Sequence, residues 1–300
     1  MTKPPILVTG AAGRIGRTLA QLLLAKGHAV RAMVRRDDDR AKSLRETGVE
    51  VIVGDLRDLD AMHKAIAGCE SVYFGMSVSE AYLEATVNVA AVAKHHGVRA
   101  FVNMSQMTLA QMSVYETTSS PQHKLHWLAE QALNWSGLPV VHVRPTVFLD
   151  GFFFRVIARD ISTRNELRLP FGTGKTSPIA VSDVAEVIAR VLDDPTSHLG
   201  KILHLTGPVS EDMNFYAAEY SRALGRTINY VDIPVEEWKA SLIERGLPTH
   251  LVSHMLTMSD MHREGRYDRL SDGVQQVTGR LPTSLFDFVK LNAEAYSSQA

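Results

Sequence analysis

The feature that most constrains this chain is a glycine-rich turn that separates an apolar run from a helix-like segment near its start. Residues 5–16 read Pro-Ile-Leu-Val-Thr-Gly-Ala-Ala-Gly-Arg-Ile-Gly, with glycines at positions 10, 13 and 16. In such a turn the backbone can approach a pyrophosphate closely, and the first N–H groups of the following helix face the anion. A tight turn that uses glycine only to reach positive φ angles is the alternative. Because the turn follows a strand-like run and opens a helix that ends at Gly27, it predicts a dinucleotide site in an α/β fold.

Strand-like and helix-like segments alternate regularly through the first half of the chain. The expected strands cover residues 6–9, 29–34, 50–53, 71–75, 100–104 and 140–144. The expected helices cover residues 14–26, 40–46, 59–67, 79–96 and 121–136, the last with Ser120 as its cap and Pro121 as its first residue. This order is typical of βαβ units, so we expect a doubly wound parallel Rossmann sheet with helices on both faces.

After Pro145 the alternation loosens and helix-like segments dominate. Helices are expected over residues 152–164, 181–193, 211–223, 235–245 and 285–295, with short strands at 201–205 and 227–231. We therefore predict a nucleotide-binding Rossmann domain over residues 1–150 and a smaller, mostly helical substrate-binding lobe over residues 151–300. The lobe is expected to be partly interleaved with the first domain and to add one or two strands to the edge of its sheet.

Composition excludes several classes of protein. The 32 basic and 33 acidic side chains nearly cancel, so we expect no polyanionic partner and no nucleic acid. The single cysteine, Cys69, excludes an intrachain disulfide and a cysteine metal cluster, and favours a reducing cytoplasm. No signal-peptide-like segment precedes the first strand and no apolar run reaches about 18 residues, so we expect a cytoplasmic protein without membrane association. The 12 histidines show no H-E-x-x-H pattern, and no catalytic metal is predicted.

The end of the second expected strand bears on which nucleotide binds. An NAD site commonly has an acidic residue there, which accepts hydrogen bonds from the ribose 2′-hydroxyl. This strand instead runs into Arg35 and Arg36, and a guanidinium can bind a 2′-phosphate. Arg35 is the first choice for that role, Arg14 the second and Arg40 the third. The alternative is a solvated strand end that faces the aspartates at 37–39. NADP is therefore the predicted cofactor, with NADPH preferred and NADH as the alternative.

The remaining coenzyme contacts are expected at the ends of the strands, where ligands bind in such sheets. The complete predicted set comprises Gly10, Ala12, Gly13, Arg14, Ile15, Arg35, Arg40, Asp55, Leu56, Met76, Met104, Ser105 and Pro145. Asp55 and Leu56 would touch the adenine, or else form a helix-capping loop. Ser105 would line the nicotinamide side, or else cap the next turn; it is not a hydrolase nucleophile, because no G-x-S-x-G elbow surrounds it.

Five segments together resemble one known family. They are Thr-Gly-Ala-Ala-Gly-Arg-Ile-Gly at 9–16, Val-Gly-Asp-Leu at 53–56, His-Trp-Leu-Ala-Glu at 126–130, Ser-Gly-Leu-Pro at 136–139 and Thr-Gly-Arg-Leu-Pro at 278–282. Over nearly its whole length the chain resembles the NmrA-like group of atypical short-chain dehydrogenases. Within that group it is most similar to NAD(P)H quinone oxidoreductases and to triphenylmethane-dye and azo-dye reductases. The resemblance implies hydride transfer to a flat aromatic acceptor without a flavin or a metal.

One departure from the wider dehydrogenase superfamily bears on the chemistry. Conventional members carry Tyr-x-x-x-Lys on the helix after the fifth strand, and their tyrosine protonates the carbonyl. With Glu130 marking the register, Gln122 takes the tyrosine position and His126 the lysine position. Tyr115 cannot supply the pair, because Ser119 follows it four residues later. A mechanism of the alcohol-dehydrogenase type is therefore not expected.

The missing acid favours a particular kind of acceptor. Hydride delivery to a ketone produces an alkoxide whose conjugate acid has a pKa of about 15.7, whereas a reduced quinone is a phenolate-like anion with a pKa of about 10. The difference corresponds to roughly 8 kcal/mol of anion stability. A site that stacks a conjugated acceptor on the nicotinamide at near-attack distance therefore needs less help from an acid.

His126 is the predicted catalytic residue, because an imidazole exchanges protons near neutral pH. Its alternative role is a hydrogen bond to the ribose or to a backbone carbonyl. Thioethers and aromatic rings make an adaptable wall for flat ligands, although at helical spacing they more often form ordinary core. The predicted substrate contacts are Met107, Gln122, Phe148, Phe152 and Met258. His254, Met258 and Met261 share a helix face that could fold over the cleft.

We therefore predict an NADPH-preferring reductase of quinones, azo dyes or related small aromatic acceptors. The alternative is a protein that binds NAD(P) and reports redox state to a partner without catalysis. A nucleotide-sugar epimerase is disfavoured because Tyr-x-x-x-Lys is absent. The physiological acceptor and the oligomeric state stay open, with a homodimer as one alternative.

Overall fold

The computed structural model describes residues 4–297, apart from the side chain of Phe152, and divides into two compact units. Unit 1 comprises the residues up to Thr117 together with 122–144 and 184–204. Unit 2 comprises Thr118–Pro121, Pro145–Asp183 and the residues from Leu205 onward. The chain thus passes into unit 2 at residues 118–121, again between Arg144 and helix α7 (Val181–Asp193), and finally after His204, and the boundary expected at residue 150 stays a prediction.

Unit 1 is built around a parallel sheet. Within the described residues its seven strands follow the order β3-β2-β1-β4-β5-β6-β8. They are β1 (Ile6–Val8), β2 (Val30–Val34), β3 (Glu50–Val53), β4 (Ser71–Phe74), β5 (Ala100–Met104), β6 (Val140–Pro145) and β8 (Ile202–Leu205). Ile6 lies beside Val30 on one neighbouring strand and beside Ser71 on the other. The predicted doubly wound Rossmann sheet is confirmed, and its strand order reverses between β1 and β4, where such sheets bind ligands.

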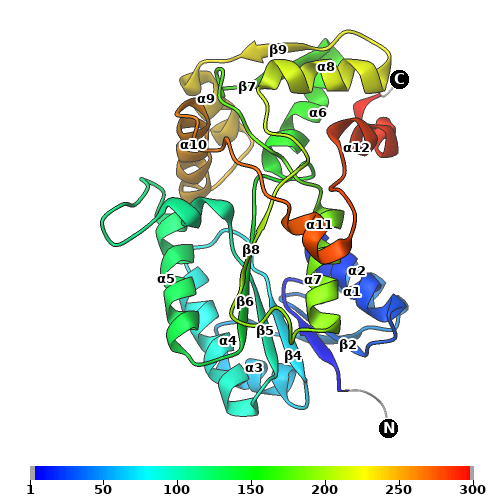
Figure 1. Cartoon of the computed structure of the whole chain (residues 1–300), viewed down its shortest axis with the longest axis vertical. Coiled ribbons are helices and arrows are strands. Elements are labelled where there is room, and N and C mark those ends of the chain that lie inside the picture. Colours follow the sequence, from blue (N-terminus) through cyan, green and yellow to red (C-terminus); the bar gives the residue numbers. More distant parts are fainter. Residues whose placement is uncertain (1–3, 298–300) are drawn as a thin grey trace. The chain divides into compact units, whose positions relative to one another are not determined.

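Helices cover both faces of this sheet. Figure 1 shows α3, α4 and α5 on one side and α1, α2 and α7 on the other. Their bounds are α1 (Arg14–Ala25), α2 (Asp39–Glu46), α3 (Leu59–Ile66), α4 (Tyr82–His96) and α5 (Pro121–Trp135), and a 3₁₀ turn, η1, spans Met107–Gln111. The carboxylates of Asp38 and Asp58 accept hydrogen bonds from the first N–H groups of α2 and α3, which explains where these helices begin. All five were expected; the largest difference is at α4, which begins at Tyr82 rather than at residue 79.

The core of unit 1 joins the sheet to the helices α4 and α5. Val72 and Phe101 from neighbouring strands pack in one cluster with Tyr82, Val89 and Leu133, and all five side chains are fully buried. Burying an aliphatic or aromatic side chain of this size stabilises a fold by about 1.5–3 kcal/mol. This packing holds α5 firmly against the sheet, and α5 carries Gln122 and His126.

Unit 2 is mostly helical. It contains α6 (Phe152–Arg164), α8 (Met213–Leu224), α9 (Val235–Glu244), α10 (Thr249–Arg263), α11 (Gly273–Thr278), α12 (Leu285–Leu291) and a 3₁₀ turn, η2 (Ala293–Tyr296). Two short strands, β7 (Glu166–Leu169) and β9 (Asn229–Asp232), pair in parallel as a separate sheet. The strand expected at 227–231 is therefore β9, which does not join the main sheet, whereas the one expected at 201–205 joins it as β8. β7 and α11 were not predicted from the sequence, and α10 was expected only as the helix face that carries His254, Met258 and Met261, without bounds.

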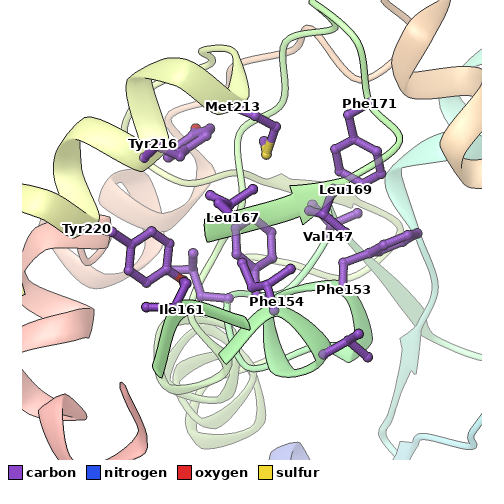
Figure 2. Packing of buried hydrophobic residues seen from close by; sticks show 14 of the residues in the cluster. Val147, Phe153, Phe154, Ile161, Leu167, Leu169, Phe171, Met213, Tyr216 and Tyr220 are labelled. Carbon is purple, nitrogen blue, oxygen red and sulfur yellow. The ribbon is translucent and has the colours of Figure 1, made fainter. Parts of the chain in front are cut away.

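The core of unit 2 is rich in aromatic side chains. Figure 2 shows Phe153 and Phe154 of α6, Leu167 of β7, and Tyr216 and Tyr220 of α8 pointing into one apolar cluster. These side chains come from elements that are far apart in the sequence, so the cluster gives unit 2 a core of its own. Across residues 4–297, no helix combines the length and the apolar character needed to cross a membrane.

Candidate coenzyme and acceptor site

The glycine turn lies against the end of β4. Gly10 has a φ of 59°, in the left-handed region, and a Cβ on it would lie 2.5 Å from the carbonyl oxygen of Gly75. The Thr9 hydroxyl donates to that same carbonyl over 3.0 Å and accepts from the Gly75 N–H over 2.9 Å. A Cβ on Gly16 would lie 2.6 Å from the Gly10 carbonyl oxygen. The first and third glycines therefore have structural reasons to be glycine, because backbone is packed where their side chains would be.

The amino end of α1 opens directly out of this turn. Gly13 is its N-cap, and no side chain caps the first N–H groups of the helix. The first turn of α1 contains no acidic residue. An uncapped helix start without a nearby carboxylate suits a negatively charged ligand, because the first N–H groups and the helix dipole attract anions. Ala12 and Ile15, which the sequence analysis assigned to the coenzyme, are half-buried beside the exposed Gly13 and Arg14.

The other predicted coenzyme residues lie at the carboxyl edge of the sheet, because each follows or ends one of its parallel strands. Arg35 follows β2, Asp55 and Leu56 follow β3, Met76 follows β4, Met104 ends β5 and precedes Ser105, and Pro145 ends β6. Met104, Ser105 and Pro145 are buried, Asp55, Leu56 and Met76 are half-buried, and Arg35 is exposed. The topology thus brings those of them that belong to unit 1 to one edge of its sheet, whereas Pro145 begins a segment of unit 2.

Two of the three aspartates that follow Arg35 pair with arginines of α2 rather than with Arg35. Arg45 contacts Asp37 over 2.7 Å, and Nε of Arg40 contacts the Asp38 carboxylate over 3.1 Å. These contacts lower the pKa of Asp37 and of Asp38. Among the described residues Arg35 forms no salt bridge, so its guanidinium is available to a ligand. Arg40 is already held by Asp38, which weakens its case as a third phosphate contact.

Asp55 is engaged within its own loop. Its carboxylate accepts hydrogen bonds from the backbone N–H of Arg57 over 2.9 Å and from the Arg57 guanidinium over 2.8 Å. The side-chain bond to Arg57 is the main reason why the pKa of Asp55 falls to about 2. The Asp55 side chain therefore shapes the loop after β3, and an adenine ring would meet a loop that is already ordered.

A buried ion pair joins α5 to β6. Nε of Arg144 donates to the carboxylate of Glu130 over 3.0 Å, and a second guanidinium nitrogen donates to its other oxygen. Burial raises the pKa of Glu130, but the hydrogen bond from Arg144 and the positive charges nearby outweigh it, so the pKa is lowered overall. Although Glu130 served as a register marker in the sequence analysis, this pairing was missed, because nothing local links the two residues.

Two asparagines hold His142 of β6 in the same region. Oδ1 of Asn134 lies 3.0 Å from Nε2 of His142, and Nδ2 of Asn103 lies 3.0 Å from Nδ1. Because a carboxamide oxygen only accepts, Nε2 carries the proton and Nδ1 accepts from Asn103. Burial lowers the pKa of His142, which keeps the ring neutral. These contacts fix β5 and β6 just before the buried Ser105.

His126 packs against a tyrosine. Its ring centroid lies 3.8 Å from that of Tyr82, and His126 is only 8% exposed. The Tyr82 hydroxyl donates to the carbonyl of Met104 over 3.0 Å, which ties the first turn of α4 to the end of β5. Burial raises the pKa of Tyr82 far above that of a free phenol, so this hydroxyl stays protonated. The sequence analysis missed Tyr82, although an aromatic hydroxyl in a buried helix turn must find a partner.

Gln122 lies on α5 one turn before His126. Its Oε1 accepts from the backbone N–H of Ser79 over 3.1 Å, and the residue is 4% exposed. Its Nε2 is buried and, within the described part of the chain, has no hydrogen-bond acceptor. A buried amide donor without an acceptor is uncommon in folded proteins. Unit 1 therefore has an unused, buried N–H donor on the first turn of α5.

The remaining predicted substrate contacts belong to different parts of the chain. Met107 is buried in η1 of unit 1, whereas Phe148 and Met258 are half-buried in unit 2. The side chain of Phe152 lies outside the described residues. The helix face expected to fold over a cleft is partly core: Met261 is 2% exposed within the unit 2 cluster, and only Met258 lies at its margin. Nδ1 of His254 lies 2.8 Å from the hydroxyl of Ser120, the residue expected to cap α5.

The model of the NmrA-like family matches residues 2–289. The chain belongs to the NmrA-like family. The match covers both units, and it confirms the relationship that the five sequence segments indicated.

Curated relatives of this NmrA-like protein match it over their full length. It is 29% identical over 295 residues to the NAD(P)H azoreductase of Xenophilus azovorans, covering 98% of this chain and 99% of the relative. It is also 29% identical over 294 residues to the (4-alkanoyl-5-oxo-2,5-dihydrofuran-3-yl)methyl phosphate reductase of Streptomyces griseus, covering 98% and 100%. Both are reductases, and this chain is an oxidoreductase.

A solved structure confirms the fold. The NADPH-dependent quinone oxidoreductase QOR2 of Escherichia coli, solved with NADPH, superposes with a TM-score of 0.84 at 23% identity. The match covers 96% of this chain and 99% of that protein. At this identity the likeness concerns the fold alone.

Proposed function

We propose that this protein is an NAD(P)H-dependent reductase that prefers NADPH and reduces quinones, azo dyes or related conjugated aromatic acceptors. The proposal rests on the sequence of α5, whose register predicts Gln122 and His126 at the places of the conventional tyrosine and lysine. An acceptor whose reduced form is a stabilised anion needs no phenol at that place. Full-length relatives that are reductases, one of them an azoreductase, support this function over that of a non-catalytic redox sensor.

The residues of unit 1 fit a nicotinamide dinucleotide. The glycine turn leaves no side chain between the backbone and a pyrophosphate, and the first N–H groups of α1 are uncapped. Gly10, Ala12, Gly13, Arg14 and Ile15 would hold the pyrophosphate side, with Asp55, Leu56 and Met76 on the adenosine side and Met104 and Ser105 toward the nicotinamide. When bound, the reduced nicotinamide supplies the hydride.

The preference for NADPH rests on Arg35. It follows β2 directly, where an acidic residue would favour an unphosphorylated ribose, and like the adjacent Arg36 it forms no salt bridge among the described residues. Paired, charge-assisted hydrogen bonds from a guanidinium are well suited to a phosphate. Arg14 is the second candidate, and Arg40 is less suitable because Asp38 holds it.

Two side chains of α5 would act on the acceptor. The buried Nε2 of Gln122 would donate a hydrogen bond to an acceptor oxygen or nitrogen and hold that atom in place. His126 would supply a proton to the reduced acceptor, while its stacking on Tyr82 keeps its ring in one orientation. Met107 of η1 would provide an apolar contact to a flat ring, and the contacts expected of Phe148, Phe152 and Met258 stay predictions.

The proposal is tested by turnover of purified protein. NADPH oxidation is followed spectroscopically with a panel of benzoquinones, naphthoquinones and azo dyes, and with a saturated ketone of similar size as the control. Acceptor-dependent oxidation with quinones or azo dyes, and none with the ketone, is the expected result. Tight NADPH binding without turnover on any acceptor would favour a sensor, and ketone reduction at comparable rates would contradict the role assigned to α5.

A further inference from the structure

Three imidazoles meet on the surface of unit 1. His63 lies in the last turn of α3, and His95 and His96 are the last two residues of α4. One ring nitrogen from each lies within 4.8 Å of the others. His63 and His95 are exposed and His96 is half-buried, so solvent reaches the cluster. No single helix carries this pattern, which is why the sequence showed no ligand spacing: the packing of α3 beside α4 creates it.

The distances within the cluster suit a tetrahedral metal ion. Zinc binds imidazole nitrogens at about 2.0–2.1 Å, so two such ligands in a tetrahedral site lie about 3.3 Å apart. Nε2 of His96 lies 3.0 Å from Nδ1 of His63. The ring centroid of His95 is 6.0 Å from that of His63 and 5.1 Å from that of His96. Small side-chain rotations would therefore bring the third nitrogen to ligand distance.

The charges around the cluster favour some cations over others. The helix dipoles place partial negative charge at the C-terminal ends of α3 and α4, where all three imidazoles lie. Lys64 and Lys94 are adjacent in sequence to His63 and His95 and carry positive charge. The Lys94 ammonium donates to the carbonyl of Gly137 over 3.1 Å. Burial and the neighbouring imidazoles lower the pKa of His96, and a neutral imidazole is the form that binds metals. Nitrogen ligands without carboxylates suit zinc, nickel or copper rather than magnesium or calcium.

We propose that His63, His95 and His96 form a binding site for a divalent transition metal, with Zn²⁺ as the best fit, that links α3 to α4. The three nitrogens would take three coordination positions, and water would take the fourth. The site differs from the coenzyme site: α3 and α4 run antiparallel to the strands, so their C-terminal ends lie at the amino edge of the sheet, opposite to Arg35 and Ser105. Its role is to bind a metal and to brace the two helices.

The test is calorimetric titration of untagged, chelator-treated protein with ZnCl₂, with MgCl₂ as a second titrant. We expect one Zn²⁺ ion per chain and no uptake of Mg²⁺. Loss of a residue that only supports a metal ligand commonly weakens metal binding by about tenfold or more, and loss of the ligand itself should cost at least as much. His63→Gln and His96→Gln should therefore each raise the dissociation constant for Zn²⁺ by about tenfold or more. His198→Gln, which removes a half-buried histidine outside the cluster, is the matched control and should bind as the wild type does.

A second readout separates a site in this cluster from adventitious binding. A metal that binds only the folded protein raises its melting temperature. At one fixed Zn²⁺ concentration, Zn²⁺ should therefore raise the melting temperature of the wild type and of His198→Gln by more than that of His63→Gln, whose circular dichroism without metal should match the wild type. Absence of Zn²⁺ binding, or binding that survives both cluster substitutions unchanged, would overturn the proposal.

Discussion

The carboxylate of Glu130 and the guanidinium of Arg144 face each other in the interior of unit 1, with side-chain exposures of 1% and 10%. Glu130 lies on α5 one turn after His126, and Arg144 lies in β6, the strand next to the one that ends at Met104. The pair therefore connects the helix of the candidate acceptor site to the sheet of the candidate coenzyme site. This buried contact has consequences for stability that can be measured.

Breaking this pair should destabilise the protein. In Glu130→Gln the buried guanidinium of Arg144 loses its counter-charge, and the loss of one partner of a buried pair commonly costs about 3–5 kcal/mol. The midpoint of urea unfolding, followed by circular dichroism, measures the loss. Glu236→Gln is the control, because Glu236 pairs with Lys239 at the surface with 84% side-chain exposure and should change the midpoint little. Equal midpoints for the two variants would show that the ion pair does not support the fold.

The same pair predicts a pH dependence. The pKa of Glu130 is lower in the folded protein than the usual value of about 4.3 in an unfolded chain. The pair's contribution is therefore fully present above pH 4.3 or so and is lost as the pH falls toward the folded pKa. The difference in urea midpoint between wild type and Glu130→Gln should be largest near neutral pH and should shrink below about pH 4. A difference that stays constant over this range would contradict the assignment.

Arg35→Ala should separate the two coenzymes. If Arg35 binds the 2′-phosphate, its removal costs charge-assisted hydrogen bonds, which are worth roughly 1.5–3 kcal/mol, or about 10- to 150-fold in affinity. NADPH binding should weaken by that factor while NADH binding changes little, as measured by fluorescence titration of each coenzyme. Arg45→Ala is the control, because Arg45 is occupied by Asp37. Equal weakening of both coenzymes would remove the argument for NADPH preference.

Gly10→Ala should disrupt the coenzyme turn. The new Cβ would lie 2.5 Å from the Gly75 carbonyl oxygen, at a residue with left-handed φ, so the turn or β4 must shift. Coenzyme binding should fall below detection even where the protein still folds. Gly27→Ala is the control: its φ of 78° is also left-handed, but no atom lies within 4 Å of the added Cβ. It should cost only the backbone strain, about 1–2 kcal/mol, and retain binding. Retained binding in Gly10→Ala would contradict the packing described for the turn.

Local sequence patterns predicted most helices and strands of unit 1, because the bounds of these elements are set by residues that are close together in the sequence. The apolar run before Gly10, the Asp38 and Asp58 caps and the Pro121 helix start are all legible over a few positions. The interactions that shape the site are not local. The Tyr82 hydroxyl meets a carbonyl 22 positions away, and the Thr9 hydroxyl one 66 positions away, so both depend on sheet order rather than on periodicity.

Unit 2 was harder to predict for a related reason. Helix α10 buries His254, Thr257, Ser259 and His262 beside its methionines, so no apolar stripe marks its buried face. His262 stacks between Phe171 and Tyr267, with centroids 3.7 and 4.0 Å away, and burial lowers its pKa to about 3. A histidine that behaves as an aromatic core residue looks polar in the sequence. Strand β7 does alternate polar Glu166 and Arg168 with buried leucines, but its four residues come just after a helix and were not recognised as a separate strand.

The role of His126 can be separated from its packing. His126→Phe keeps an aromatic ring against Tyr82 but removes the nitrogen atoms that could carry a proton. If His126 supplies a proton to the reduced acceptor, kcat with a quinone should fall by about 10²-fold or more while the KM for NADPH stays within a few-fold of the wild type. Tyr82→Phe is the control, because it keeps the ring pair and removes only the hydroxyl that bonds to Met104. An unchanged kcat in His126→Phe would show that the imidazole only fills space, and protonation would then have to come from water.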